Sequence, residues 1–132
     1  MTLKKINPTK TKSWKKLKTH FKEIENEEIK NLLSSRPSNE DFNLKWNDFN
    51  VDISKNRIDN TTLNLLIELA NECDLKDAIS KQFNGDSINE TEKRAVLHTA
   101  VRTDGNEKIN FNGLDIVPSI LETRKQIKSF TN

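Results

Sequence analysis

The sequence has few cysteines and glycines and lacks any long apolar run. Cys73 is its only cysteine, which excludes an intrachain disulfide and any zinc site built from several cysteines. The three glycines stand too far apart for a GxGxxG or GxxxxGK[ST] phosphate loop. No stretch approaches the roughly 20 apolar residues that cross a bilayer, so we expect neither a signal peptide nor a membrane partner.

Residue patterns that could bind a metal are also lacking in the sequence. His20 and His98 are the only histidines, no HExxH pattern occurs, and the carboxylates are scattered among lysines. We therefore expect no metal and no cofactor. A single cysteine favours a reducing compartment, so we expect a cytoplasmic protein, with Cys73 as a packing residue.

Apolar residues are also scarce. They make up 33% of the chain, against a usual value of about 45–50%, and charged residues make up 32%, against about 25%. Such a composition fits a segment that covers a larger body, or a helical domain with broad solvated faces. The net charge of +2 and the periodic apolar residues argue against full disorder.

Lysine is concentrated at the start of the chain. The first 22 residues carry eight lysines and no acidic residue, which leaves 14 basic and 20 acidic residues elsewhere. Such a run can attract nucleic acid or an anionic membrane. Between Lys4 and Lys18 there is one Phe, Tyr or Trp, namely Trp14, and no arginine. We therefore favour a solvated segment that pairs with the acidic remainder, without a nucleic-acid partner.

The periodicity predicts a mainly α-helical chain with one small β-hairpin, an α+β fold. We expect a flexible basic arm over residues 1–12 and a single helical segment over 13–132. Ser13 is the expected cap of the first helix, and Pro37 the expected stop of the second. The remaining expected elements are a second helix over 27–33, a hairpin over 42–53, a helix capped by Asn60 or Thr61, a helix over 75–83 and a helix after Asn89. The helix after Asn60 or Thr61 should carry a core stripe of Leu63, Leu66, Ile67 and Ala70, and Gly85 should take a positive φ after the helix over 75–83. A loop with a short extended piece over 108–111 then leads to a last helix that contains Pro118.

The expected helix from Asn89 carries the candidate site. Asn89 and Glu92 have the spacing of a capping box, and Glu90, Arg94, His98 and Arg102 recur every four residues. Arg94, His98 and Arg102 could hold a phosphate. The alternative, which we favour, is that Glu90 pairs with Arg94 and that the arginines make structural contacts.

The polar element Asp52, Ser54, Lys55 and Asn56 follows the expected hairpin. It could contact a ligand or a sister subunit, or it could form a turn held by its own side chains. We favour the turn.

Four segments carry a family resemblance, and together they cover most of the chain. They are FNLKWNDFNVDISKNRI (Phe42 to Ile58), FNG (Phe83 to Gly85), INETEKRAVLHTAVR (Ile88 to Arg102) and the stretch from Leu114 to Phe130. In this order they resemble the N-terminal region of glucose-6-phosphate isomerases, with Val101 where leucine is usual. The lysine-rich start is less typical of that family.

The resemblance implies the N-terminal helical segment of a larger two-lobed α/β sugar isomerase fold, which forms a homodimer. The implied reaction is the metal-free isomerisation of glucose 6-phosphate to fructose 6-phosphate. The family's glycine- and serine-rich loop and its acid and base residues lie in later segments, so His98 and Glu92 receive no catalytic role. We expect a fragment that is inactive alone. The alternative is a non-enzymatic helical module that binds a protein partner.

Overall fold

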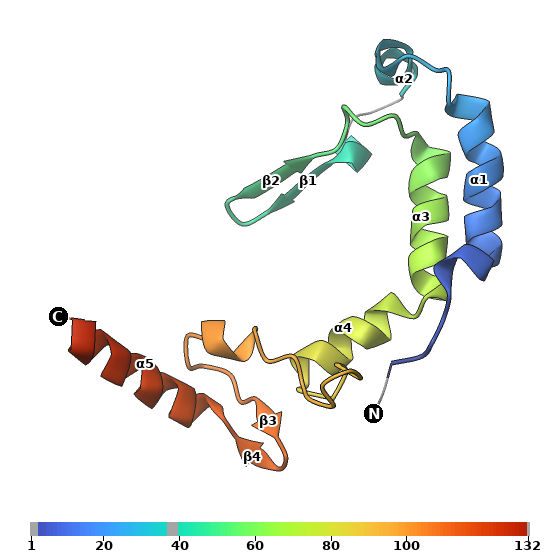
Figure 1. Cartoon of the computed structure of the whole chain (residues 1–132). Helices are drawn as coiled ribbons and strands as arrows, with labels where there is room; N and C mark the ends of the chain where they lie inside the picture. The colour runs from blue at the N-terminus through green and yellow to red at the C-terminus, as the bar shows by residue number, and fades with distance from the viewer. Residues whose placement is uncertain (1–2, 37–39, 132) are drawn as a thin grey trace. The chain divides into compact units, whose positions relative to one another are not determined.

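The structure, a computed structural model, describes residues 3–36 and 40–131. These residues form the helices α1 (Lys12–Ile24), α2 (Ile29–Ser35), α3 (Asn60–Glu72), α4 (Leu75–Phe83) and α5 (Val117–Thr131), shown in Figure 1. The strands are β1 (Asn43–Trp46), β2 (Phe49–Asp52), β3 (Asn110–Phe111) and β4 (Leu114–Asp115). The prediction of a mainly helical chain with a hairpin is confirmed.

Contacts within the chain divide it into two units, which we describe separately. One unit comprises residues 6–73, and the other comprises the described residues of 1–5 and 74–132. The boundary falls inside the segment 13–132 that the sequence predicts as one piece. The short 3-10 helix η1 (Pro8–Lys10) lies within the predicted arm, whose flexibility stays a prediction.

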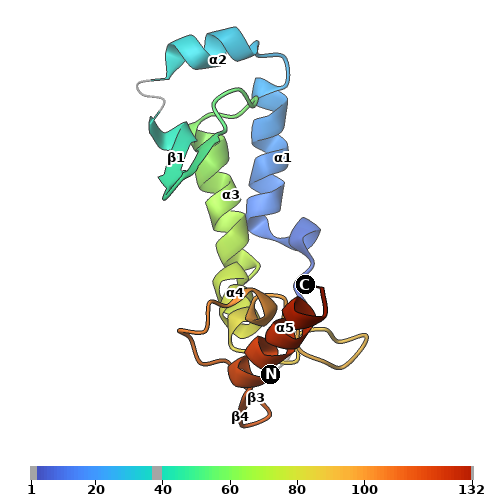
Figure 2. The ribbon, with the colours of Figure 1, turned by 90° about the vertical axis from the view of Figure 1, so that its left-hand side faces the viewer.

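The 6–73 unit is built on the pair α1 and α3, which lie side by side in Figures 1 and 2. Both helices begin at caps that differ from the expected residues. Thr11 caps α1 by accepting from the Trp14 N–H at 3.2 Å, so Ser13 lies inside the first turn. Asp59 caps α3 and forms a reciprocal capping box with Thr62, because a carboxylate one residue earlier reaches the N3 amide.

Three polar contacts run along this pair and show that the helices are antiparallel. Ser13 meets Glu72 at one end, Lys16 meets Glu68 in the middle, and His20 meets Asp59 at the other end. Ser13, His20 and Leu65 are buried between them. By contrast, Leu66 and Ile67, which we expected on the core stripe of this helix, are 43% and 53% exposed.

The predicted hairpin is confirmed, with Leu44 opposite Val51 and Trp46 opposite Phe49. Arg36 ties its base to the chain that leads into α3. Its guanidinium donates to the Ser54 carbonyl at 2.6 Å and to the Ile58 carbonyl at 2.5 Å, and lies 4.0 Å from the centre of the Phe42 ring. Helix α2 begins and ends two residues later than expected, and Pro37, its expected stop, lies outside the described residues.

The 74–132 unit starts with α4, whose predicted bounds are confirmed, and Gly85 takes the positive φ expected after its end. Ala100, Ile109 and Val117 form a small buried core. The fold class needs one correction here, because β3 and β4 form a second hairpin. We expected a loop with a short extended piece over 108–111, which contains β3 but has no partner strand in the prediction. Asn112 and Gly113 both have positive φ at its turn, as a type I′ turn requires, but the two-residue strands are too short to show alternation.

The expected helix over Asn89 to Arg102 is wrong. The Asn89 and Arg94 backbones bond to each other in both directions, at 3.1 and 3.2 Å, and close a tight turn. Lys93 takes a left-handed φ of 52° within it, which interrupts a right-handed helix. The Glu92 N–H still donates to the Asn89 side chain at 3.2 Å, so the capping bond forms without the helix. The helical structure within residues 89–102 is the 3-10 turn η3 (Ala100–Arg102).

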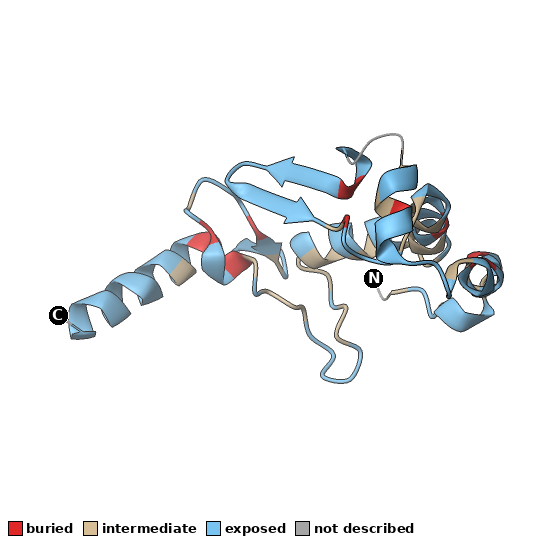
Figure 3. Cartoon of the chain, turned by 90° about the horizontal axis from the view of Figure 1, so that it is seen from above, coloured by how far each residue is buried: buried red, intermediate tan, exposed pale blue. Residues whose placement is uncertain are grey.

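The core of each unit is thin, as the composition predicts. Figure 3 shows buried positions as isolated patches on mostly exposed elements. The exposed hydrophobic side chains include all four on one face of the β1–β2 hairpin, at 49–69% exposure. No helix within residues 3–36 and 40–131 has the length and apolar character to cross a membrane.

Candidate functional site

The turn at Asn89 and the loop after it border a hollow in the 74–132 unit. Its volume is about 420 Å³. Arg94 and His98 line it together with mostly apolar neighbours, which are Ala95, Val96, Leu97, Val101 and Phe111. Arg102 is not among the lining residues. The structure therefore brings two of the three predicted phosphate candidates to one hollow, without the helical stripe that we expected to align them.

The two arginines of the candidate site are engaged in local contacts. Arg94 Nη2 lies 2.5 Å from Glu92 Oε2, with the two side chains 68% and 51% exposed. Arg102 Nη1 donates to the His98 carbonyl at 3.0 Å. The expected Glu90–Arg94 pair is wrong, because the helix that would align these residues is absent, and Glu90 instead lies 2.9 Å from Lys5 Nζ. One nitrogen of each arginine is thus engaged in a local contact, and phosphate contact by Arg94, His98 and Arg102 stays a prediction.

The element after the first hairpin forms the favoured turn. The Ser54 N–H donates to Asp52 Oδ1 at 2.8 Å, and Asn56 Nδ2 donates to the Ile53 carbonyl at 3.0 Å. The hydrogen bonds from the Ser54 hydroxyl and N–H lower the pKa of the Asp52 carboxyl below its ordinary value. These local bonds give Asp52, Ser54 and Asn56 a role in the turn, and a contact to a ligand or to a sister subunit stays a prediction.

Three of the eight lysines at the start of the chain, Lys4, Lys5 and Lys16, have acidic partners among the described residues, in the way the favoured interpretation predicts. Lys4 pairs with Asp74, and Lys16 Nζ lies 2.8 Å from Glu68 Oε2. Each carboxylate accepts a hydrogen bond from its lysine, which raises the pKa of Lys4 and of Lys16. Among the described residues, no group of three His, Cys, Asp or Glu side chains could hold a metal ion.

A polar cluster surrounds His20, a residue whose sequence context indicated only a possible zinc ligand. His20 is 8% exposed and contacts Glu23, Asp59 and Thr62, all in the 6–73 unit. The i,i+3 spacing of His20 and Glu23 was a readable local signal. The partners from α3 lie 39 and 42 residues away, and no local pattern indicates them.

Comparison with known proteins supplies the family. A family model described as Phosphoglucose isomerase matches residues 52–132. The chain is 47% identical over 131 residues to the glucose-6-phosphate isomerase of Christiangramia forsetii, covering 98% of this chain and 24% of that protein. It is 44% identical over 130 residues to the protein of that name from Wigglesworthia glossinidia brevipalpis, covering 97% of this chain and 24% of that protein.

A third relative, the glucose-6-phosphate isomerase of Buchnera aphidicola subsp. Cinara cedri, is 46% identical over 133 residues, with 98% of this chain and 24% of the relative covered. The chain therefore spans about a quarter of the length of the curated relatives it matches. The family model covers more than half of the chain and includes the hollow, the turn at Asn89 and the β3–β4 hairpin. This chain belongs to the phosphoglucose isomerase family.

Proposed function

We propose that these 132 residues are a structural segment of a glucose-6-phosphate isomerase, which interconverts glucose 6-phosphate and fructose 6-phosphate. The observation that carries the proposal is identity of 44–47% to proteins of that name over nearly the whole chain. Because the chain spans 24% of their length, the activity belongs to the longer protein. In that protein we propose a sugar phosphate as substrate, a homodimer of two-lobed α/β subunits, and a cytoplasmic location.

The local contacts support a structural role for this segment. Arg94 is paired with Glu92, and Arg102 is bonded to a backbone carbonyl. The hollow that Arg94 and His98 line has mainly apolar side chains around it, which suit packing better than they suit a phosphate dianion. We therefore propose that the 132-residue polypeptide by itself does not isomerise sugar phosphates. Phosphate contact by Arg94, His98 and Arg102 remains the weaker hypothesis for the complete enzyme.

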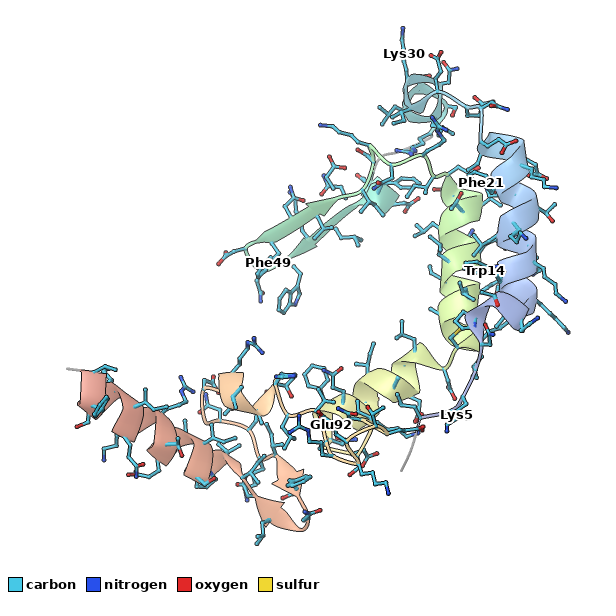
Figure 4. The ribbon with its side chains drawn as sticks, viewed as in Figure 1. Lys5, Trp14, Phe21, Lys30, Phe49 and Glu92 are labelled. Carbon is cyan, nitrogen blue, oxygen red and sulfur yellow. The ribbon has the colours of Figure 1, made fainter. Side chains whose placement is uncertain are left out.

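The exposed face of the first hairpin supports a place within a larger protein. Trp46 and Phe49 stack with ring centres 5.7 Å apart, yet they are 69% and 65% exposed, and Figure 4 shows Phe49 beside the hairpin turn. Leu44 and Val51 continue the same face. Isolated hairpins are marginal in water, and a contiguous apolar face of this kind is usually covered. We propose that the rest of the isomerase covers it.

A chimaera tests the assignment. These 132 residues would replace the matching quarter of the Christiangramia forsetii relative, and fructose 6-phosphate conversion would be measured by a coupled assay in protein from a host without its own isomerase. We expect turnover within about tenfold of the intact relative, and none from the 132-residue chain alone. A soluble, folded chimaera without activity would contradict the assignment, and turnover by the chain alone would contradict the structural role.

Matched variants test how the segment contributes. Trp46→Ser with Phe49→Ser alters the apolar face of the hairpin, whereas Lys45→Ser with Asn50→Ser alters the opposite face at neighbouring positions. We expect the first pair of changes to reduce soluble, active chimaera and the second to leave it unchanged. Arg94→Met and Arg102→Met test the phosphate hypothesis, which requires a raised KM for fructose 6-phosphate.

The exposed hairpin face also favours a second candidate, a helical module that binds another protein. Such a module would work as the 132-residue chain, with no need for the remainder of an isomerase. Gel filtration separates the candidates when combined with the chimaera. The module would be favoured by two results together: the chain alone is a stable monomer with a cooperative thermal transition, and the chimaera is inactive.

A further inference from the structure

The imidazole of His20 lies between two helices of the 6–73 unit and is surrounded by acidic groups. His20 is on α1, one residue before Phe21. Figure 4 labels Phe21 and Trp14 on this helix. Its Nδ1 lies 3.1 Å from Glu23 Oε2, on the same helix. Its Nε2 lies 2.9 Å from Asp59 Oδ1, the residue that caps α3. The ring therefore joins the two helices.

The partners of Nε2 require a hydrogen on that atom. Thr62 Oγ1 lies 3.0 Å from Nε2, but its single hydroxyl hydrogen is donated to Asp59 Oδ1 at 2.8 Å. Thr62 can therefore only accept from the ring, and the Asp59 carboxylate can also only accept. Nε2 faces two acceptors, so it acts as the donor.

The partner of Nδ1 requires a second hydrogen on the ring. Glu23 carries a carboxylate with a 66% exposed side chain, and a carboxylate only accepts hydrogen bonds. A neutral imidazole has one N–H, so it can satisfy one of these two carboxylates and must turn a lone pair toward the other. Both contacts exist together only when the ring is an imidazolium.

We propose that His20 is held as an imidazolium that clasps α1 to the capped start of α3, and that the clasp weakens when the ring loses its proton as pH rises. The charged groups facing the ring are Glu23 from α1 and Asp59 from the start of α3. Two cations, Lys18 and Arg57, line the hollow beside it. Arg57 is held by the Glu25 carbonyl, to which its Nη1 donates at 2.6 Å.

The balance of these surroundings agrees with the geometry. Burial of His20 favours the neutral ring, but the hydrogen bonds and charges of Glu23 and Asp59 outweigh it and raise its pKa above the ordinary 6.5. A group whose pKa is raised on folding stabilises the fold fully below its unfolded value. That contribution is lost as pH rises through the folded pKa. The clasp should therefore be closed in mildly acidic solution and weaker in alkaline solution.

Imidazole nitrogen NMR on the 15N-labelled 132-residue chain tests the protonation state directly. Its two ring nitrogens have similar shifts in an imidazolium and widely separated shifts in a neutral ring. His98, the other histidine, is assigned by a His98→Asn variant. We expect the His20 titration midpoint to lie above 6.5. A midpoint at or below that value, or a neutral ring at pH 6, would overturn the proposal.

Charge-neutral variants test the partners. Glu23→Gln and Asp59→Asn each remove one carboxylate, and asparagine still caps a helix, so α3 keeps its start. We expect each to lower the His20 midpoint, and Glu25→Gln, which alters an exposed neighbouring carboxylate, to leave it in place. Unchanged midpoints in both test variants would overturn the proposal even if the wild-type value is high.

Stability measurements test the consequence. Urea unfolding of the wild-type chain from pH 6 to pH 9 should show the folding constant falling, tenfold for each unit that separates the folded and unfolded pKa values. His20→Gln should remove that fall, and His98→Gln should keep it. If His20→Gln does not fold, Glu23→Gln supplies the same comparison, with a smaller fall expected. A pH dependence identical in wild type and Glu23→Gln would contradict the clasp.

Discussion

The Glu72 carboxylate accepts two hydrogen bonds from Ser13, from its backbone N–H at 3.0 Å and from its hydroxyl at 2.5 Å. Ser13 is in the first turn of α1, where backbone N–H groups lack partners within the helix. Ser13 is 1% exposed, so water cannot replace the carboxylate without opening the contact. The last residue of α3 therefore completes the start of α1, and the two helices depend on each other at this end.

Glu72→Ala should consequently destabilise the chain more than Glu68→Ala does. Both substitutions remove a carboxylate of α3 that contacts α1, but Glu68 meets the 58% exposed side chain of Lys16, and exposed ion pairs contribute little. Thermal unfolding at pH 7 gives the comparison. Equal shifts in Tm for the two variants would mean that the bonds from Ser13 to Glu72 stabilise the fold no more than the ion pair between Lys16 and Glu68 does.

The same contact predicts a loss of stability in acid. The hydrogen bonds from the Ser13 hydroxyl and N–H lower the pKa of Glu72 below the ordinary 4.5. A depressed pKa stabilises the fold above the unfolded value, and this contribution disappears as pH falls through the folded pKa. Urea midpoints between pH 6 and pH 3 should therefore fall less steeply in Glu72→Ala than in the wild type.

Arg36→Lys should reduce the free energy of unfolding by about 1–3 kcal/mol, because a lysine ammonium cannot reach two carbonyls in a fixed fork and lie over the Phe42 ring at once. Arg57→Lys is the matched control. Arg57 is exposed and, among the residues that the structure describes, donates one hydrogen bond, to the Glu25 carbonyl, so we expect a change within about 0.5 kcal/mol. Urea unfolding measures both, and a neutral Arg36→Lys would contradict the role of Arg36 in holding the hairpin base.

Sequence periodicity predicted those elements whose residues face a regular environment. The alternation of apolar and polar residues from Phe42 to Ile53 predicted the first hairpin. The stretch from Leu75 to Phe83, closed by Asn84 and Gly85, predicted α4 with its bounds. The long-range contacts carried no local signal. Ser13 and Glu72 are 59 residues apart, and Arg36 bonds to carbonyls that every residue possesses, so nothing in the spacing identifies either pair.

The failure at residues 89–102 has a different cause. An Asn side chain that accepts from the amide three residues later begins a helix in one context and closes a turn in another, because the two share that first bond. The outcome depends on Lys93, whose side chain does not favour a left-handed φ, and on the bonds between the Asn89 and Arg94 backbones. The geometry of the candidate residues was accordingly not predicted, and their contact with a phosphate stays a prediction.

Two glycines separate backbone strain from packing. Gly85 and Gly113 have φ of 76° and 80°, so alanine is strained at both, by about 1–2 kcal/mol. A Cβ at Gly113 meets nothing within 4 Å, whereas at Gly85 it would lie 3.1 Å from the Asn110 carbonyl oxygen and 3.4 Å from Leu97. We expect Gly85→Ala to cost at least about 1 kcal/mol more than Gly113→Ala in urea unfolding. Equal costs would show that the residues around Gly85 move to accommodate a Cβ without a measurable loss of stability.

Substitution of Lys93 distinguishes the observed turn from the helix that the sequence suggests. At a left-handed φ of 52°, glycine avoids the steric cost that a Cβ carries, so Lys93→Gly should be more stable than Lys93→Ala by up to about 1 kcal/mol. In a helix the order reverses, because alanine is favoured over glycine by about 1 kcal/mol. Lys76, exposed within α4, supplies the control, and there we expect Lys76→Ala to be the more stable. Urea unfolding of the four variants under one condition measures both signs. If alanine proves more stable than glycine at both positions, the chain at Lys93 is helical in solution. Opposite signs at the two positions establish the left-handed conformation of Lys93 that closes the turn between Asn89 and Arg94.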